Sequence, residues 1–270
     1  MRYTRAPMGE RAAVTTLKRR PWRRAALSLA ALLVVVAAVG YLAYRNRYAL
    51  MALLKRPPNP AIVQWFNDPA RRAELKSAFD APCPGYPFLV PSDGFIGGLP
   101  WNAPYGPYTI LNPHPGIDIF GGGAPGTVPV RAAYDGWLTR EADWVSTVII
   151  RHNDPLHPGE TIWTYYTHMA NGDGSQDFID PAFPPGVVEV PVAQGQVIGY
   201  QGVYNGDRVA GYGDDNLHLH FSIVKSDAEG RYLNEAIFSN TLDPTPYLGL
   251  RLNEADSPQW PMRCLPPPGS

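Results

Sequence analysis

Residues 217–224 read Leu-His-Leu-His-Phe-Ser-Ile-Val, an alternation that predicts a β-strand with two different faces. In a strand, side chains at positions i and i+2 share a face. His218 and His220 therefore project together into one cleft, and Leu219 points the other way, into packing. By itself a His-x-His pair is a weak indication of a functional site, so the rest of the chain has to support it.

Support comes from two upstream motifs. His114 and Asp118 lie in His-Pro-Gly-Ile-Asp, and His168 ends the run Trp-Thr-Tyr-Tyr-Thr-His. Neutral imidazole and carboxylate are the ligands that a catalytic zinc prefers, as three protein groups with a fourth position left for water. Four of the six histidines thus fall into one metal-site pattern.

The order His-x-x-x-Asp, then a lone His, then His-x-His resembles the lysostaphin-type zinc endopeptidases, which cut peptidoglycan cross-bridges. The flanks agree: residues 128–137 read Val-Pro-Val-Arg-Ala-Ala-Tyr-Asp-Gly-Trp, and residues 194–200 read Gln-Gly-Gln-Val-Ile-Gly-Tyr. The match runs in order over residues 108–226. Some members of this family have lost ligands and act as binding regulators; here no ligand is missing, so that interpretation loses its usual support.

The resemblance assigns roles to five residues. It implies one zinc ion per chain, held by His114, Asp118 and His220, with His168 and His218 as catalytic residues. Such a zinc would activate a water and polarise the scissile carbonyl. One catalytic histidine would take the proton and the other would donate a hydrogen bond to the oxyanion. The sequence leaves open which does which.

Short apolar runs separated by Gly, Pro, Asn and Asp predict an all-β fold from about residue 83 onward. The resemblance implies an antiparallel β-sandwich with zinc in a groove, which we place at residues 83–250 with its core at 108–226. Tyr108 and Tyr166 are candidate substrate contacts, although aromatic side chains in strands are more often part of a core. His152 and His157 are interpreted as ordinary residues of a polar hairpin loop.

Two stretches are longer than the resemblance leads us to expect. Residues 171–191 and 207–216 adjoin His168 and His218 respectively. Both are expected to flank the cleft, where they would set specificity or cover the site.

Residues 25–44 carry no charge and would span about 30 Å as a helix, the thickness of a bilayer core. Eight Lys or Arg precede the run and four follow closely. This bias predicts a single-pass membrane protein with residues 1–24 in the cytoplasm and the catalytic domain outside it. A cleaved signal peptide and a buried helix of a soluble domain are the alternatives. Residues 45–82 then form a juxtamembrane linker, with a short amphipathic helix over 61–79 that Pro69 must break or restart.

Charge follows the same division. Residues 1–56 hold 12 of the 23 Lys and Arg, whereas 23 of the 24 acidic residues come later, so the remainder carries a net charge of −12. An acidic ectodomain argues against a nucleic-acid partner.

Cys83 and Cys264 are the two cysteines of the chain. An even number in an exported protein indicates a disulfide, which would tie the start of the domain to the irregular tail, residues 251–270. Two unpaired thiols are the alternative.

Three functions compete on this evidence. The first is a membrane-anchored zinc endopeptidase acting on peptidoglycan peptides. The second is a non-cleaving wall-peptide-binding regulator of another hydrolase, and the third is a protease acting on envelope proteins. A regulatory protein partner is plausible for the first, and the sequence does not identify one.

Overall fold

The computed structural model describes residues 21–47, 50, 53–105, 107–206, 217–256 and 259–269. The chain forms two compact units, Met1–Ala52 and Leu53–Ser270. The second unit extends beyond the expected domain, residues 83–250, at both ends. Residues 207–216, one of the two stretches expected to flank the cleft, lie outside the described residues.

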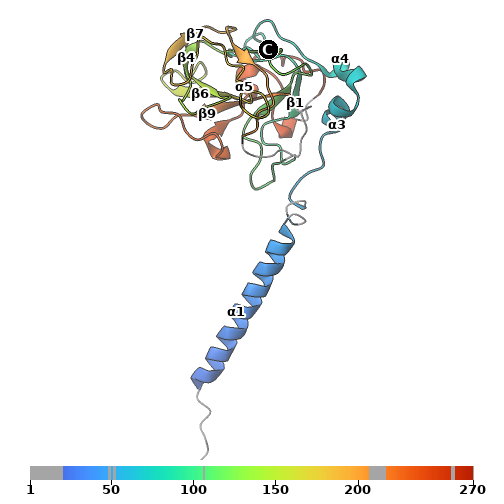
Figure 1. The fold of residues 1–270 in the computed structure, drawn as a ribbon, viewed down its shortest axis with the longest axis vertical. Helices are drawn as coiled ribbons and strands as arrows, with labels where there is room; N and C mark the ends of the chain where they lie inside the picture. The colour runs from blue at the N-terminus through green and yellow to red at the C-terminus, as the bar shows by residue number, and fades with distance from the viewer. Residues whose placement is uncertain are drawn as a thin grey trace, which may run out of the picture. The chain divides into compact units, whose positions relative to one another are not determined.

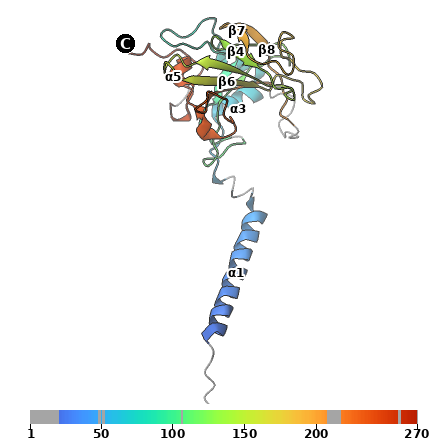
Figure 2. The ribbon, with the colours of Figure 1, turned by 90° about the vertical axis from the view of Figure 1, so that its left-hand side faces the viewer.

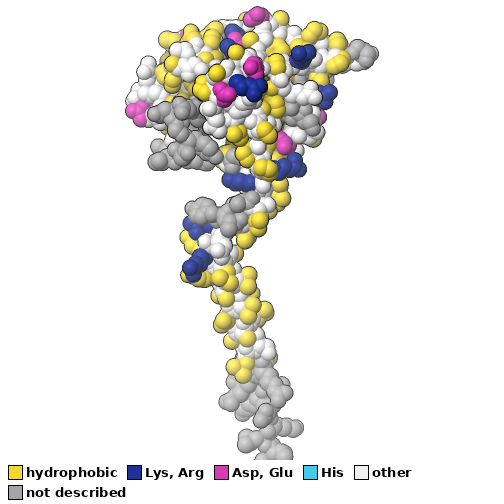
Figure 3. Space-filling model, turned by 90° about the vertical axis from the view of Figure 1, so that its right-hand side faces the viewer, with side chains coloured by type: hydrophobic (Ala, Val, Ile, Leu, Met, Phe, Trp, Pro, Cys, Tyr) yellow, Lys and Arg dark blue, Asp and Glu magenta, His cyan; other side chains and the backbone are white. Residues whose placement is uncertain are grey.

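The first unit contains one long helix, α1 (Pro21–Arg45). Its segment Ala25–Arg45 contains a window with a mean hydropathy of 2.5, of which 0% is buried. Apolar side chains cover its surface in Figure 3. A helix of this length and composition fits either a membrane anchor or a signal sequence.

Short helices replace the amphipathic helix expected over residues 61–79. They are α3 (Pro60–Asn67), the 3-10 turn η1 (Pro69–Arg71) and α4 (Arg72–Leu75). The break falls at Asp68, whose backbone is non-helical because a residue preceding proline disfavours the α conformation.

The α3 helix packs on the β domain. Its Trp65 is buried, and the indole stacks on Phe95 of β1 with the ring centroids 5.4 Å apart. Figure 1 shows α3 and α4 beside β1. The Trp65 side chain therefore holds α3 against the β domain.

The remainder is antiparallel β structure, as the sequence predicts. An eight-stranded sheet has the order β1-β2-β9-β6-β5-β4-β7, with β10 paired to β9, and β3 pairs with β8 in a second sheet (Figures 1 and 2). The strands are β1 (Phe95–Leu99), β2 (Ile117–Phe120), β3 (Pro129–Arg131), β4 (Gly136–Thr139), β5 (Val148–Asn153), β6 (Thr161–Thr167), β7 (Val190–Val192), β8 (Val197–Tyr200), β9 (Leu219–Lys225) and β10 (Thr241–Leu242). Short helical turns η2 (Phe238–Asn240), α5 (Thr245–Leu248) and η3 (Glu254–Asp256) complete the described elements.

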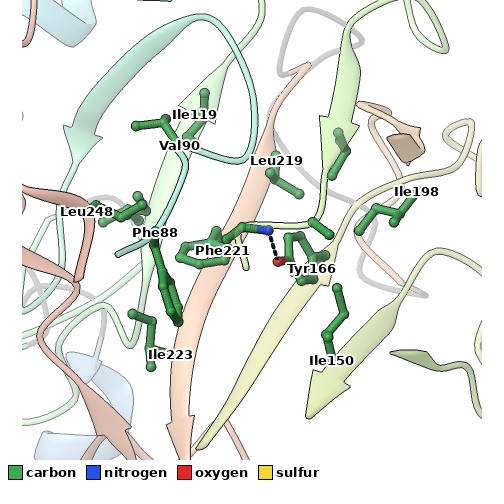
Figure 4. Packing of buried hydrophobic residues seen from close by; sticks show 14 of the residues in the cluster. Phe88, Val90, Ile119, Ile150, Tyr166, Ile198, Leu219, Phe221, Ile223 and Leu248 are labelled. Atoms are coloured by element: carbon green, nitrogen blue, oxygen red, sulfur yellow. Dashed lines mark hydrogen bonds between the residues drawn. The ribbon is translucent and has the colours of Figure 1, made fainter. Parts of the chain in front are cut away.

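Strand β9 has one face in the apolar core and the other face at the candidate site. Leu219, Phe221 and Ile223 are fully buried in the main apolar cluster, where they meet Phe88 and Leu248 (Figure 4). The alternate residues of β9 face the other side of the sheet. The alternation read from residues 217–224 is therefore present in the fold.

Tyr166 also lies in this core, so its candidacy as a substrate contact is wrong. Its ring is fully buried, and its hydroxyl accepts a hydrogen bond from the Ala133 backbone N–H at 2.9 Å. Figure 4 shows it against the core residues of β9. Since strand side chains alternate, its neighbour Tyr165 points to the opposite face of the sheet.

His152 lies in β5 and not in a hairpin loop. It is fully buried, with ring nitrogens bonded to the Asp135 carbonyl at 2.8 Å and to Thr164 Oγ1 at 2.7 Å. Burial lowers the pKa of His152 to about 4, so it stays neutral at pH 7. It is a satisfied core histidine, while His157 lies in the turn that follows β5.

The expected disulfide is present between Cys83 and Cys264, 181 residues apart in sequence. Two hydrogen bonds reinforce the connection: the Leu265 N–H donates to the Gly249 carbonyl, and the Tyr86 hydroxyl donates to the Pro266 carbonyl. The alternative of two unpaired thiols does not hold.

We expect the double substitution Cys83→Ala, Cys264→Ala to lower the free energy of unfolding by about 2–5 kcal/mol, as is common when a native disulfide is removed. The reason is the larger conformational freedom of the unfolded chain once this long loop is open. Urea denaturation under non-reducing conditions would measure the shift. Reductant should destabilise the unsubstituted protein similarly, and an unchanged midpoint in both experiments would contradict the prediction.

Candidate metal centre

Two adjacent strands, β2 and β9, and the segment before β2 bring the expected ligands together. Asp118 of β2 lies directly opposite His220 of β9, and Thr167 of β6 lies opposite His220 on its other side. His114 precedes β2 by three residues, and its backbone is fixed by hydrogen bonds with Asn102 and Ala103. Residues separated by about 100 positions in sequence thus meet on one face of the sheet.

Three potential ligand atoms converge at this point. His114 Nε2 lies 3.0 Å from His220 Nδ1, and Asp118 Oδ1 lies 2.9 Å from His220 Nδ1 and 3.3 Å from His114 Nε2. All three residues are buried. Among the described residues they form a His-Asp-His group able to hold a metal ion.

The outward nitrogens of both rings are already committed. His114 Nδ1 donates to the Pro100 carbonyl at 3.1 Å, and His220 Nε2 donates to Glu235 Oε1 at 2.8 Å. With the proton on these outward nitrogens, the inward nitrogen of each ring presents a lone pair whenever the ring is neutral. When both rings are neutral, two lone pairs and a carboxylate oxygen face one another, and either a bound cation or a proton on His220 Nδ1 shared with Asp118 Oδ1 relieves the repulsion.

This donor set fits zinc. Two imidazole nitrogens and one carboxylate oxygen are the ligands of an open catalytic zinc site, and partners that orient the rings are a regular feature of such sites. All three donor atoms can be deprotonated when a metal ion is bound, and all three face the same point.

The electrostatics of the metal-free group agree with a cation site. For His220, burial lowers the pKa, but the charges of Glu235 and Asp118 and the hydrogen bonds that His220 donates to both outweigh it and raise the pKa to about 10. For Asp118, burial opposes ionisation, but the neighbouring His114 and His218 hold its pKa well below the usual value. The surroundings thus favour positive charge at the point where the ligands converge.

Both expected catalytic histidines lie beside this group. His168 follows β6 directly, and its ring centroid is 4.4 Å from that of His218 and 6.1 Å from that of His220. His168 Nδ1 donates to the Tyr204 carbonyl at 2.6 Å, which makes Nε2 the basic atom of the ring. Burial, followed by the charges of His218 and His220, lowers the pKa of His168, so it is neutral at pH 7.

The backbone of His168 is unusual. Its φ is 74°, in the left-handed region that side chains other than glycine rarely adopt. Strained backbone of this kind persists only where the surroundings hold it, and it concentrates at functional sites. At this position the strained conformation brings the imidazole next to His218.

Of the aromatic candidates, Tyr108 is the one beside the metal group. Its half-buried ring lies 4.6 Å from the ring of His114, centroid to centroid. Tyr165, on the site face of β6, lies 6.1 Å from the His220 ring. Tyr108 therefore stays a candidate for contact with a bound substrate.

The stretch 171–191 is folded onto the domain. Arg140 is buried and donates to Asp177 Oδ2 at 2.7 Å and to the Phe183 carbonyl at 3.2 Å. Phe183 itself is buried in the core. These contacts fix the segment that leaves the site after His168.

Glu235 is a site residue that the sequence did not single out. It lies in the connection after β9, ten residues beyond Lys225, and its side chain is almost buried. It accepts hydrogen bonds from His220 Nε2 and from Ser222 Oγ, at 2.8 and 3.0 Å. The path of the connection after β9 brings Glu235 next to His220. No sequence motif marks the spacing between the two residues, so the sequence could not have identified the contact.

We expect Glu235→Gln to weaken zinc binding by about 10–100-fold, the usual cost of losing a group that orients a ligating histidine. The amide keeps the shape of the side chain but loses the charge that fixes the His220 tautomer. Competition with a chromophoric chelator would measure the affinity. Glu229→Gln, an exposed acid of the same connection, is the matched control. Equal affinities of the two variants would show that Glu235 does not act on the metal ligand.

The geometry defines a class of site: a His-Asp-His group able to hold a metal ion, with two further histidines beside it. No model of a known protein family matches the chain, and no curated protein matches it. Among solved structures, the chain is similar to the catalytic domain of the antimicrobial peptidase lysostaphin from Staphylococcus simulans. The identity is 23% and the TM-score 0.33, over 68% of this chain and 96% of that one.

Two further solved structures show a similar degree of likeness. One is a putative glycyl-glycine endopeptidase LytM from Ruminococcus gnavus, at 24% identity and a TM-score of 0.32, over 49% of this chain and 45% of that one. The other is a zinc containing peptidase from Vibrio cholerae, at 18% identity and a TM-score of 0.30, over 58% and 40%. At these identities and TM-scores the function has to be argued from the chain's own residues.

Proposed function

We propose that the chain is a membrane-anchored zinc endopeptidase that hydrolyses peptide cross-links of bacterial peptidoglycan. The observation that carries the proposal is the convergence of His114 Nε2, Asp118 Oδ1 and His220 Nδ1, with His168 and His218 alongside. The substrate class comes from the motif order, which resembles that of the lysostaphin-type endopeptidases.

His114, Asp118 and His220 would hold one zinc ion per chain. A zinc ion held there supplies Lewis-acid activation of a water and of the scissile carbonyl. Pro100 and Glu235 keep the two ligating rings in the tautomers that direct a lone pair inward. The catalytic domain in this proposal is an antiparallel β-sandwich with its core at residues 108–226.

His168 and His218 would move protons during hydrolysis. Because His168 Nδ1 is committed to the Tyr204 carbonyl, Nε2 is the atom that accepts a proton from the attacking water. The leaving amine nitrogen takes up that proton when the carbon–nitrogen bond breaks. Before that bond breaks, His218, whose ring lies 4.4 Å from that of His168, would donate a hydrogen bond to the oxyanion.

The test of the activity is incubation of the full-length protein, in mild detergent, with purified cross-linked wall fragments. New amino termini identified by mass spectrometry would support an endopeptidase. The activity should disappear with a chelator and return with zinc. Fragments that bind without being cut would indicate a binding regulator instead. Cleavage of an unfolded protein substrate but not of wall would indicate a protease for envelope proteins.

We propose that α1 is retained as the anchor, with the amino terminus in the cytoplasm and the Leu53–Ser270 unit outside. Protease added to intact spheroplasts should digest that unit and leave a tag before residue 2 protected. The protein should stay in the membrane fraction through a high-salt wash, which removes electrostatically bound proteins but not a spanning helix. A soluble mature protein beginning near residue 45 would instead identify the helix as a cleaved signal.

A further inference from the structure

Three large apolar side chains lie exposed where the β domain begins. They are Leu53, 82% exposed, Ile110, 55% exposed, and Leu111, 78% exposed, and we call them the apolar rim. Two backbone hydrogen bonds place their segments side by side: Ile110 N donates to the Leu54 carbonyl at 3.1 Å, and Arg56 N donates to the Pro104 carbonyl at 3.2 Å.

The two residues at 110 and 111 sit at the tip of a tight turn. Thr109 N donates to the Asn112 carbonyl and Asn112 N donates to the Thr109 carbonyl, at 3.0 and 3.1 Å. The Thr109 hydroxyl accepts two further N–H bonds within the turn. Central turn positions are usually occupied by Gly, Asn, Asp or Ser. Here a fixed turn presents Ile110 and Leu111 outward.

Single exposed apolar residues are common on protein surfaces, whereas a cluster of them indicates a contact with an apolar partner. Chain connectivity identifies the partner. Leu53 follows the end of α1, Arg45, by eight residues, which span at most about 29 Å when fully extended. If α1 crosses the membrane, the apolar rim cannot be far from the bilayer surface.

The charges of the residues between α1 and the β domain are also compatible with a lipid surface. Arg45, Arg47 and Lys55 are exposed and basic, as is common for chain next to anionic headgroups. Arg56 is also exposed and pairs with Glu254 at 3.5 Å, and Arg47 donates to the Tyr44 carbonyl at 3.1 Å. The apolar side chains, with basic residues nearby, match a membrane interface better than a peptide.

We propose that the apolar rim docks the catalytic domain onto the lipid interface, a role that rests on the proposed membrane anchor. The turn continues directly into the metal centre, since Tyr108 lies against the His114 ring and Asn112 is two residues before it. Docking through this turn would therefore hold the metal centre at a set height and orientation above the bilayer. The enzyme would then cut wall peptides near the membrane.

The test is fluorescence quenching by lipids in nanodiscs that contain the full-length protein. Both native cysteines are in the disulfide, so introduced cysteines can be labelled selectively. Three single variants carry the fluorophore: Asn112→Cys beside the rim, Val35→Cys in α1, and Val188→Cys, an exposed residue before β7 at the opposite edge of the sheet from β1. Spin-labelled lipids then report which positions contact the bilayer.

We expect a large fluorescence loss at residues 35 and 112 and little loss at 188. Adding Ile110→Ser and Leu111→Ser to the Asn112→Cys protein should reduce its loss to the level at 188. An unchanged loss would mean that the tether alone brings the turn near lipid, and docking would be refuted. Loss at 35 with none at 112 would also refute docking while leaving the anchor intact. No loss at 35 would refute the anchor itself.

Discussion

Replacing Asp118 with asparagine is expected to abolish tight zinc binding and wall-peptide hydrolysis together. The carboxylate supplies the one formal negative charge among the three converging ligand atoms, and the side chain lies within 3.3 Å of both histidine nitrogens. Asparagine keeps the shape of the side chain but removes the charge. A catalytic metal contributes several kcal/mol, and a loss of about 4 kcal/mol corresponds to about a thousandfold slower turnover.

Elemental analysis of protein purified without chelator should find about one zinc equivalent in the unsubstituted chain and little in the variant. Asp143→Asn, an exposed acid between β4 and β5, is the matched control and should keep both zinc and activity. Near-ultraviolet circular dichroism would establish that the variant is folded. Full zinc occupancy in a folded Asp118→Asn protein would refute the assignment of this ligand, and His114→Ala tests the second ligand in the same way.

Replacing either of the two proposed catalytic histidines, His168 or His218, should separate zinc binding from turnover. We expect His168→Asn and His218→Ala to keep about one zinc and to lose turnover by about a hundredfold or more, the usual contribution of a general base or an oxyanion donor. Asparagine is the better substitution at residue 168, because the backbone there has a φ of 74° and asparagine tolerates that region. Measurement of kcat and zinc content on the same preparations tests both expectations.

The exposed His157, in the turn after β5, provides the control, and His157→Ala should leave kcat unchanged. Normal turnover in either site variant would remove that residue from the mechanism. Loss of zinc in His218→Ala would mean that His218, and not His220, is the ligand. The geometry favours His220, whose Nδ1 lies 2.9 Å from Asp118 and 3.0 Å from His114.

The residues by themselves predicted an all-β fold, the long apolar helix and the shared face of His218 and His220, and the resemblance to the lysostaphin-type endopeptidases implied the antiparallel arrangement and the full set of site residues. The residues could do so because strand periodicity is local: His218 and His220 must share a face, and Leu219 must take the other. Ligand chemistry is equally local, since only a few residue types bind zinc. The disulfide followed from a count of two cysteines in a chain expected to be exported, although pairing was one of two possibilities.

Only the tertiary structure decided what depends on register and on the paths of connections. Tyr165 and Tyr166 are equivalent in sequence, but the pairing of β6 with β9 puts Tyr166 in the core and Tyr165 on the site face. From the sequence, His152 was interpreted as a loop residue. In the structure, β5 extends to Asn153 and His152 is a buried strand residue. Glu235 carries no motif, and it orients His220 only because the connection after β9 folds back beneath the sheet face. Such contacts join residues far apart in sequence, so their cause lies in the packing of the whole domain and not in any local pattern.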